Sequence, residues 1–337
     1  MLKYLSVLEQ SVAIDGCSQA QSIQDAIELA KLCETLGFHR FWVSEHHSHP
    51  SIVGSAPEIL MAAISSVTQS IRLGSAGVML PHYSALKVAE QFRVLEALAP
   101  GRIDLGVGRA PGSDLKTAQL LNPDSHSSER FPEQIRDLSL WLKDEIFPDG
   151  HPGKGVHAYP QSETSPDLWV LGSSDYGAQV AAHFGLPYAF AHFITDGRNS
   201  KAAIDIYKSN FVPSEHLPKP QALVCVWALA AETEEEAWRQ FASRFKWRSD
   251  RNQGKLGPLV SPELALSTLS QMERAQFDLM RSNALVGNPE QVMSKLNALA
   301  EELEIEEISV ITWAHDFYVR QSSYRLLAEA AGLNGRN

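Results

Sequence analysis

Histidine and arginine side chains recur where the segments predicted to be strands end. They occur in Ser44–Pro50 and at His82, Arg109, His192 and His315. A histidine exchanges protons near neutral pH, and the planar guanidinium of an arginine suits a phosphate or a carboxylate. These positions indicate acid–base chemistry and the binding of an anionic group.

The segment Glu45-His46-His47-Ser48-His49 allows two interpretations. Neighbouring histidines of an extended chain point to opposite sides, so His46 and His47 cannot easily share a metal ion, although His47 and His49 could. No H-E-x-x-H pattern supplies a second ligand set. General acid–base catalysis needs only one histidine. We favour that interpretation, without a metal, and the other histidines then only cap the strand and its loop.

Two glycine-containing segments could hold an anion. Gly106–Gly112 is not a dinucleotide fingerprint, because its third glycine comes one residue late and Pro111 stands where that motif has glycine. The segment instead projects Arg109, which binds an anion or simply closes a loop. Gly172–Gly177 joins a predicted strand to a helix start, where backbone N–H groups favour negative charge. Ser174 there contributes to a phosphate cradle or is an ordinary helix cap.

Two weaker signals lie inside predicted strands. Leu73-Gly74-Ser75-Ala76-Gly77 concentrates small residues, which indicates a bulge, the close approach of a flat ligand, or tight packing. Trp227 and Trp313 could line an aromatic pocket, although each is explained more simply as core filling.

The elements that must position these residues alternate between strands and helices. Eight β-α pairs are predicted, the number that closes an α/β (β/α)8 TIM barrel, with a doubly wound sheet as the alternative. A barrel places its active site at the C-terminal ends of its strands. The predicted strands are Tyr4–Glu9, Phe41–Ser44, Ile71–Leu80, Arg102–Val107, Leu168–Leu171, Tyr188–Phe193, Ala222–Ala230 and Ile308–Trp313. The predicted helices are Ser22–Leu36, Pro57–Thr68, Ala85–Leu98, Ser128–Ile146, Tyr176–Phe184, Ser200–Phe211, Thr233–Trp247 and Tyr318–Ala331.

Two stretches lie outside this alternation. His151–Ser165 is rich in Gly, Pro and polar residues and predicts a loop or small hairpin. Asp250–Val286 fits neither element of a pair. We expect it to be an insertion, at about 250–286, before the last strand of a single domain that covers 1–337.

Composition excludes several classes of protein. The chain of 337 residues has 29 Lys+Arg and 40 Asp+Glu, a net charge of −11, which argues against a nucleic-acid partner. No run approaches the roughly 18 apolar residues of a spanning helix, so no membrane partner is expected. The three cysteines form no C-x-x-C pair. Their odd number and wide spacing predict a reducing, cytoplasmic location, with Cys33 and Cys225 buried.

Together these residues resemble the bacterial luciferase-like family of flavin-dependent monooxygenases, the LLM class of flavin-dependent oxidoreductases. The resemblance runs in order through nearly the whole chain, and no single piece of it is specific alone. The segments that carry it are Ser44–His47, Ile71–His82, Ala89–Phe92, Leu95–Leu98, Pro100–Arg109, Gly185–Pro187 and Val286–Glu290.

The resemblance implies a TIM barrel, usually a homodimer, with FMN bound across the C-terminal ends of the strands. Ala76 and Gly77 would form a bulge under the isoalloxazine ring, with a non-proline cis peptide between them. His46 matches the active-site histidine of the family. The FMN phosphate would be held by Arg109, Ser173, Ser174, Tyr176 and Gly177.

Two positions depart from luciferase itself. Ser173-Ser174 replaces a carboxylate-serine pair, which changes one polar contact in the phosphate loop. Gly108 stands where luciferase has a reactive cysteine, so light emission is not supported.

The implied activity is a two-component monooxygenase, which acts on paired donors and incorporates molecular oxygen. No nicotinamide fingerprint is present, so a separate NAD(P)H:flavin reductase would supply reduced FMN. Addition of O2 would give a flavin C4a-hydroperoxide, and His46 would hydrogen-bond to it or exchange a proton with the small organic substrate. Three alternatives remain: a deazaflavin in place of FMN, a non-catalytic flavin-binding protein, and a non-redox barrel enzyme acting on a phosphorylated metabolite.

Overall fold

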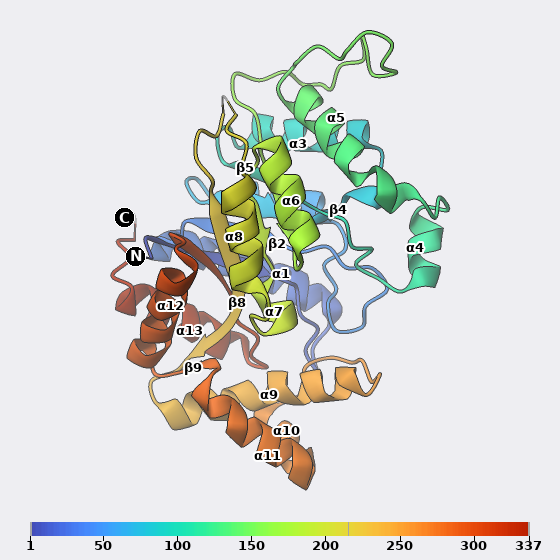
Figure 1. Ribbon diagram of the computed structural model, residues 1–337. Coiled ribbons are helices and arrows are strands. Elements are labelled where there is room, and N and C mark those ends of the chain that lie inside the picture. Colours follow the sequence, from blue (N-terminus) through green and yellow to red (C-terminus); the bar gives the residue numbers. More distant parts are fainter. Residues whose placement is uncertain (1, 215, 336–337) are drawn as a thin grey trace. The chain divides into compact units, whose positions relative to one another are not determined.

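The structure is a computed structural model that describes residues 2–214 and 216–335 (Figure 1). Its strands are β1 (Tyr4–Glu9), β2 (Arg40–Val43), β3 (Arg72–Ser75), β4 (Val78–Met79), β5 (Ile103–Gly108), β6 (Asp167–Gly172), β7 (Tyr188–Phe190), β8 (Ala222–Ala230), β9 (Leu285–Gly287) and β10 (Glu307–Ile311). The order in the sheet is β10-β1-β2-β3-β5-β6-β7-β8, and β8 also pairs with β10, so the sheet closes. The short strands β4 and β9 pair in parallel with β5 and β8. The chain is a (β/α)8 TIM barrel, as the sequence predicts.

The helices follow the strands along the chain. They are α1 (Gln19–Leu36), α2 (Pro57–Ser65), α3 (Ala85–Leu98), α4 (Leu115–Leu121), α5 (Phe131–Leu142), α6 (Asp175–Phe184), α7 (His192–Thr195), α8 (Ser200–Asn210), α9 (Glu234–Asn252), α10 (Pro262–Thr268), α11 (Gln271–Leu279), α12 (Pro289–Leu303) and α13 (Phe317–Ala330). Several ends match their sequence signals. Helix α1 stops at Gly37, whose φ of 85° is the left-handed conformation that glycine adopts readily.

The chain divides into two compact units. The terminal unit holds the described residues of 1–41, 49–54 and 225–337, and the central unit holds those of 42–48 and 55–224. Strands β2 and β8 have residues in both units. The prediction of a single domain over 1–337 stays a prediction.

A buried carboxylate links neighbouring strands of the central unit. Asp104 on β5 is fully buried and accepts hydrogen bonds from Trp42 Nε1 on β2, at 2.9 Å, and from Arg72 Nη2 on β3, at 2.6 Å. Arg72 also contacts the carboxylate of Asp167 on β6. A buried charge is tolerated when such partners surround it. The cluster therefore fixes the register of four neighbouring strands, β2, β3, β5 and β6.

The predicted strand Ile71–Leu80 is interrupted. Gly74 pairs with Asp104 and Val78 pairs with Val107, so the β3–β4 side has one residue more than β5 over this stretch. One extra residue on one side defines a bulge. The bulge that the small residues indicate is therefore present, and the Ala76–Gly77 peptide is cis.

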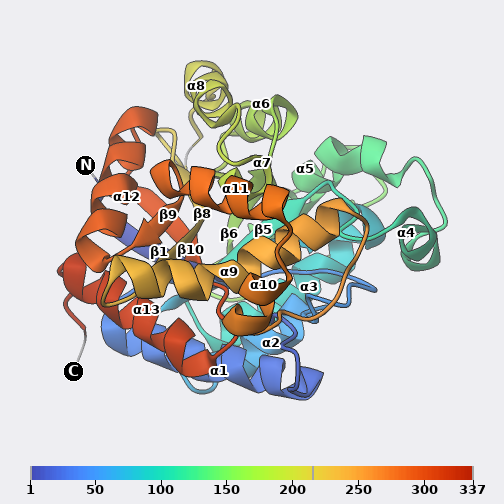
Figure 2. The same cartoon turned by 90° about the horizontal axis from the view of Figure 1, so that it is seen from below.

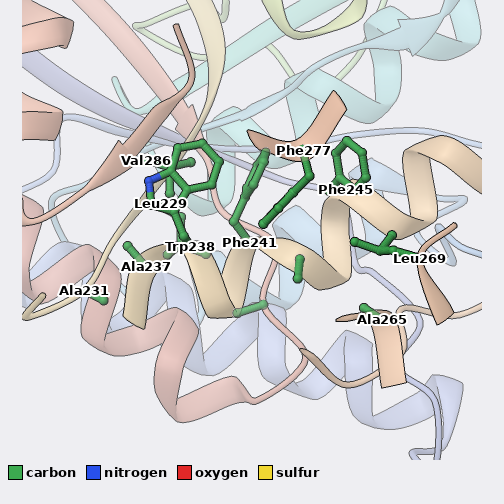
Figure 3. Close-up of a cluster of buried hydrophobic side chains, with 12 residues drawn as sticks. Leu229, Ala231, Ala237, Trp238, Phe241, Phe245, Ala265, Leu269, Phe277 and Val286 are labelled. Carbon is green, nitrogen blue, oxygen red and sulfur yellow. The ribbon is translucent and has the colours of Figure 1, made fainter. Parts of the chain in front are cut away.

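In the terminal unit, the predicted insertion is mostly helical. Helices α10 and α11 pack with α9 (Figure 2) around a cluster of buried aromatic and aliphatic side chains (Figure 3). Trp238 and Phe277 meet edge to face with ring centroids 5.5 Å apart. This apolar cluster gives α10 and α11 their tertiary support, since short helices are marginal alone.

Several predicted boundaries are wrong. The predicted helix Ser128–Ile146 is a 3-10 turn at Ser127–Arg130 followed by α5, because Phe131-Pro132 starts a new helix with proline in its first turn. Helix α4 was not predicted, and none of its residues is buried. Helix α12 was also missed, although Asn288 and Gln291 form a capping box at its start.

The cysteines are all free. Cys33 and Cys225 are buried, as predicted, and Cys17 is exposed. Burial raises the pKa of the Cys33 thiol well above its ordinary value and that of Cys225 to about 12. Within the described residues, every helix is too short or too polar to cross a lipid bilayer.

Two glycines on β5 give a matched test of the close packing at the bulge. A Cβ on Gly106 would lie 2.1 Å from the Ser75 carbonyl oxygen, whereas one on Gly108 would meet only Met79 Sδ, at 3.9 Å. We expect Gly106→Ala to lower the free energy of unfolding by at least about 1–3 kcal/mol, because backbone must move. Gly108→Ala should leave it nearly unchanged. Thermal unfolding followed by circular dichroism measures both, and equal melting temperatures would contradict this account.

Candidate active site

The segment after β2 separates its two neighbouring histidines. His46 Nδ1 lies 3.3 Å from Ser44 Oγ, whereas His47 Nε2 lies 2.6 Å from Glu45 Oε1. His46 and His47 are both partly exposed, and Glu45 is buried. Within residues 2–214 and 216–335, no three His, Cys, Asp or Glu side chains gather closely enough to hold a metal ion. The arrangement can supply an imidazole for proton exchange.

The bulge provides a surface formed by backbone rather than by side chains. Gly77 is buried and Ala76 is partly exposed. A Cβ on Gly77 would lie 2.9 Å from the Gly106 carbonyl oxygen, which also accepts a hydrogen bond from Ser75 Oγ at 2.8 Å. Side chains larger than hydrogen are therefore excluded from this point of the central unit. The backbones of the bulge and of β5 are thus packed directly against each other.

Arg109 lies directly after β5 and is exposed. Its guanidinium carbon lies 4.0 Å from the centroid of the Tyr176 ring, in the first turn of α6. Among the described residues, no carboxylate pairs with Arg109. The stacked guanidinium keeps its N–H donors available for an anion.

The start of α6 lies beside this arginine. Ser174 is the N-cap residue, but its hydroxyl makes no capping hydrogen bond. The first N–H groups of a helix have no partner within the helix. Ser173, Ser174 and these N–H groups, together with Arg109, make a donor set that fits a phosphate.

Glycine packing and a tyrosine hold this helix start close to β6. A Cβ on Gly172 would lie 3.3 Å from the Gly177 Cα, and one on Gly177 would lie 3.2 Å from the Gly172 Cα. The Tyr188 hydroxyl donates to the Ser174 carbonyl oxygen at 3.3 Å. Burial, with a smaller contribution from Asp175, raises the pKa of Tyr188 above its ordinary value, so the phenol stays protonated as a donor.

All the residues predicted to bind the cofactor, and His46, lie in the central unit. The structure brings Arg109 against Tyr176 and Gly172 against Gly177. Sequence reasoning missed Tyr83, whose hydroxyl donates to Glu45 Oε1 at 2.6 Å. The strand-end rule points to the segment Pro81-His82-Tyr83, but the contact itself joins residues that are far apart along the chain.

The other singled-out residues lie elsewhere. In the terminal unit, Trp313 is buried and meets Trp227 edge to face, with ring centroids 4.7 Å apart. Trp313 fills the core, as its simpler interpretation holds, and Trp227 is only partly buried. His315 Nε2 lies 3.3 Å from the Asp15 carbonyl oxygen, and His192 begins α7 in the central unit.

Comparison with known proteins gives consistent matches over the full length. A chain from Escherichia coli strain K12 named luciferase-like monooxygenase is 36% identical over 324 residues, 95% of each chain. An N-acetyl-S-alkylcysteine monooxygenase from Bacillus subtilis strain 168 is 35% identical over 332 residues, 97% of each chain. The solved structure of apo-MsnO8 matches with a TM-score of 0.90 and 38% identity, covering 99% of each chain.

More distant matches are found by sequence and by structure. A flavin-dependent trigonelline monooxygenase, oxygenase component, from Acinetobacter baylyi is 22% identical over 299 residues, 84% of this chain and 82% of that one. The oxygenating constituent of 3,6-diketocamphane monooxygenase in complex with FMN has a TM-score of 0.72 and 18% identity, covering 98% of each chain. An F420-dependent secondary alcohol dehydrogenase has a TM-score of 0.70 and 15% identity, covering 98% of this chain and 99% of that one.

The model of the family described as luciferase-like monooxygenase matches the sequence over residues 4–307. This match covers most of the chain, and the relatives above are matched over nearly their full length. The chain belongs to the luciferase-like monooxygenase family.

Proposed function

We propose that this chain is the oxygenase component of a two-component monooxygenase, which uses reduced FMN and O2 on a small organic substrate. The observation that carries the proposal is the Arg109 guanidinium stacked on Tyr176, beside a helix start whose N-cap hydroxyl makes no capping bond. Family membership supports the flavin chemistry. The name of the Acinetobacter relative, an oxygenase component, supports a separate reductase.

The residues of the central unit have distinct roles in this proposal. Arg109, Ser173, Ser174 and the α6 N–H groups bind the phosphate, and the backbone surface at Ala76–Gly77 supports the ring. Reduced flavin, when bound, supplies the activation of O2. His46 holds or moves a proton at Nε2, because Ser44 Oγ lies next to Nδ1. The protein thus contributes binding, orientation and proton transfer.

An anaerobic titration with oxidised and then reduced FMN, followed by tryptophan fluorescence, tests the cofactor. We expect reduced FMN to bind more tightly. Tight binding of oxidised FMN without any oxygen-dependent product would instead favour a non-catalytic flavin-binding protein. Binding of neither form would favour a deazaflavin, in line with the F420-dependent neighbour, or a phosphorylated metabolite.

Replacing Arg109 tests the phosphate site in the same titration. We expect Arg109→Ala to weaken FMN binding about 10- to 100-fold, because a hydrogen bond to a charged group is worth about 1.5–3 kcal/mol. Riboflavin lacks the phosphate, so its affinity should stay within about twofold. An equal loss for both flavins would place the arginine away from the phosphate.

Replacing His46 tests the proton-transfer role without knowledge of the substrate. We expect His46→Ala to change the rate at which protein-bound reduced FMN becomes oxidised in air by at least about tenfold, since general acid–base catalysis contributes about 10²–10⁴-fold. The affinity for FMN should be retained. His49→Ala is the matched control, because His49 Nδ1 accepts from the Ser51 N–H and serves its own loop. An unchanged rate in His46→Ala would remove the assigned role.

We also propose that the chain forms a homodimer through a groove between α2 and α3. The groove has a volume of about 460 Å³ and exposes Ile59, Val94 and Leu98 to 68%, 47% and 58%. Lys87 and the carboxylates Glu58 and Glu90 also line it. A surface with both signs of charge can pair with a two-fold-related copy of itself, and the exposed Ile59, Val94 and Leu98 would supply the apolar contacts.

A single charge in the groove tests this assembly. The wild-type chain should sediment at twice its mass of 37.2 kDa, and Val94→Asp should sediment as a monomer, because the new carboxylate would be buried without a partner. Ile146→Asp is the control, because Ile146 is 87% exposed but lies outside the groove. A monomeric wild type, or a dimeric Val94→Asp, would contradict the assignment.

A further inference from the structure

A buried carboxylate lies one residue before the candidate catalytic histidine. The Glu45 side chain is 1% exposed. Its Oε1 lies 2.6 Å from both the Tyr83 hydroxyl and His47 Nε2, and its Oε2 accepts from the Met79 N–H at 3.1 Å. These donors come from the segment after β2, from the end of β4, and from the residue after the 3-10 turn Leu80–His82.

The hydrogen-bond partners of this carboxylate are a tyrosine hydroxyl, a backbone N–H and a histidine ring, rather than a permanently charged side chain. Within the described residues, no lysine or arginine lies at ion-pair distance from Glu45, and His47 is its only such partner. Burial and Glu45 together raise the pKa of Tyr83 far above its ordinary value, so the phenol remains a donor at all working pH values. An isolated buried carboxylate is unfavourable, so the donors and Glu45 hold one another in place.

The same cluster also holds the loop that follows β5. The His47 N–H donates to the Gly112 carbonyl oxygen at 3.2 Å, and His82 Nε2 lies 2.8 Å from the Pro111 carbonyl oxygen. Gly112 has a φ of 58°, and a Cβ there would lie 2.8 Å from Met79 Cε. The loop that begins at Arg109 is thus held by His47, which belongs to the Glu45 cluster, and by His82, whose ring meets that of His47 edge to face with centroids 6.1 Å apart.

We propose that Glu45 is a positioning residue that fixes the positions of both His46 and Arg109 through the segments that follow β2, β4 and β5. The inference rests on the proposed function, because it assigns a role in flavin binding to a residue that does not touch the flavin. Its effect follows from geometry. When Glu45 is removed, Tyr83, His47 and the Met79 N–H lose their shared acceptor, and the loops after β2 and β5 lose their fixed separation.

The test compares the ratio of FMN to riboflavin affinity with the thermal stability of each variant. We expect Glu45→Ala to lower that ratio at least about fivefold and to change the rate of air oxidation of bound reduced FMN at least about fivefold. Glu45→Gln should fall between Glu45→Ala and wild type, because its amide oxygen still accepts from Tyr83. A role in stability alone predicts a lower melting temperature with an unchanged affinity ratio.

Asp104→Asn is the matched control. Asp104 is a second buried carboxylate of the central unit, and its partners Trp42 and Arg72 are not part of the Glu45 cluster. This variant should lose stability and keep the affinity ratio. If Glu45→Ala does not fold, Tyr83→Phe replaces it, and the ratio should then fall about two- to threefold.

The outcomes separate this inference from the proposed function. If Arg109→Ala lowers the affinity ratio and the Glu45 and Tyr83 variants leave it within about 1.5-fold, the positioning role is wrong and the phosphate site stands. If Arg109→Ala itself leaves the ratio unchanged, the proposed function fails first.

Discussion

The central unit depends on the charge of Asp104 being satisfied in the interior. Trp42 and Arg72 satisfy it from two other strands, and Arg72 extends the cluster to Asp167. An uncompensated buried carboxylate costs several kcal/mol, so these strands cannot slide relative to one another without losing their donors. Strands β2 and β5 lead directly into the segments that carry His46 and Arg109. The ion cluster thus sets the register of these strands, whereas contacts between the loops hold the side chains of the candidate site.

Much of the fold could be read from the sequence because its signals are local. The alternation of strands and helices gave eight pairs, and Gly37 marked the end of α1 through its positive φ. Other features were missed for physical reasons. Helix α4 lies on the surface with none of its residues buried, and it was missed, whereas the small residues of Leu73–Gly77 did indicate the bulge that the pairings of β3 and β4 with β5 show. The capping box at Asn288 was a readable signal that was overlooked.

Those candidate site residues that lie at the end of a single strand could be predicted from the sequence. The rule that barrel enzymes use the C-terminal ends of their strands selected the segments that hold His46 and Arg109, and the family resemblance chose His46 among its neighbours. Contacts between loops were outside that rule. Neither the stacking of Arg109 on Tyr176 nor the acceptance of the Tyr83 hydroxyl by Glu45 has a sequence signature, since each joins residues brought together only by the closed sheet. The residues that could do chemistry were thus predictable from their place at strand ends. The contacts that hold them could be seen only in the structure.

The three cysteines differ in exposure in a way that allows the chain to be labelled at a single site. The thiolate is the form that attacks a thiol reagent, and the raised pKa values of buried Cys33 and Cys225 keep both as thiols. Cys17 is exposed and lies in the segment before α1, outside the central unit that holds the candidate flavin site. A maleimide dye therefore attaches at one position of the natural sequence without any engineered residue. Single-molecule and fluorescence-transfer measurements on the unmodified site become accessible from that one thiol.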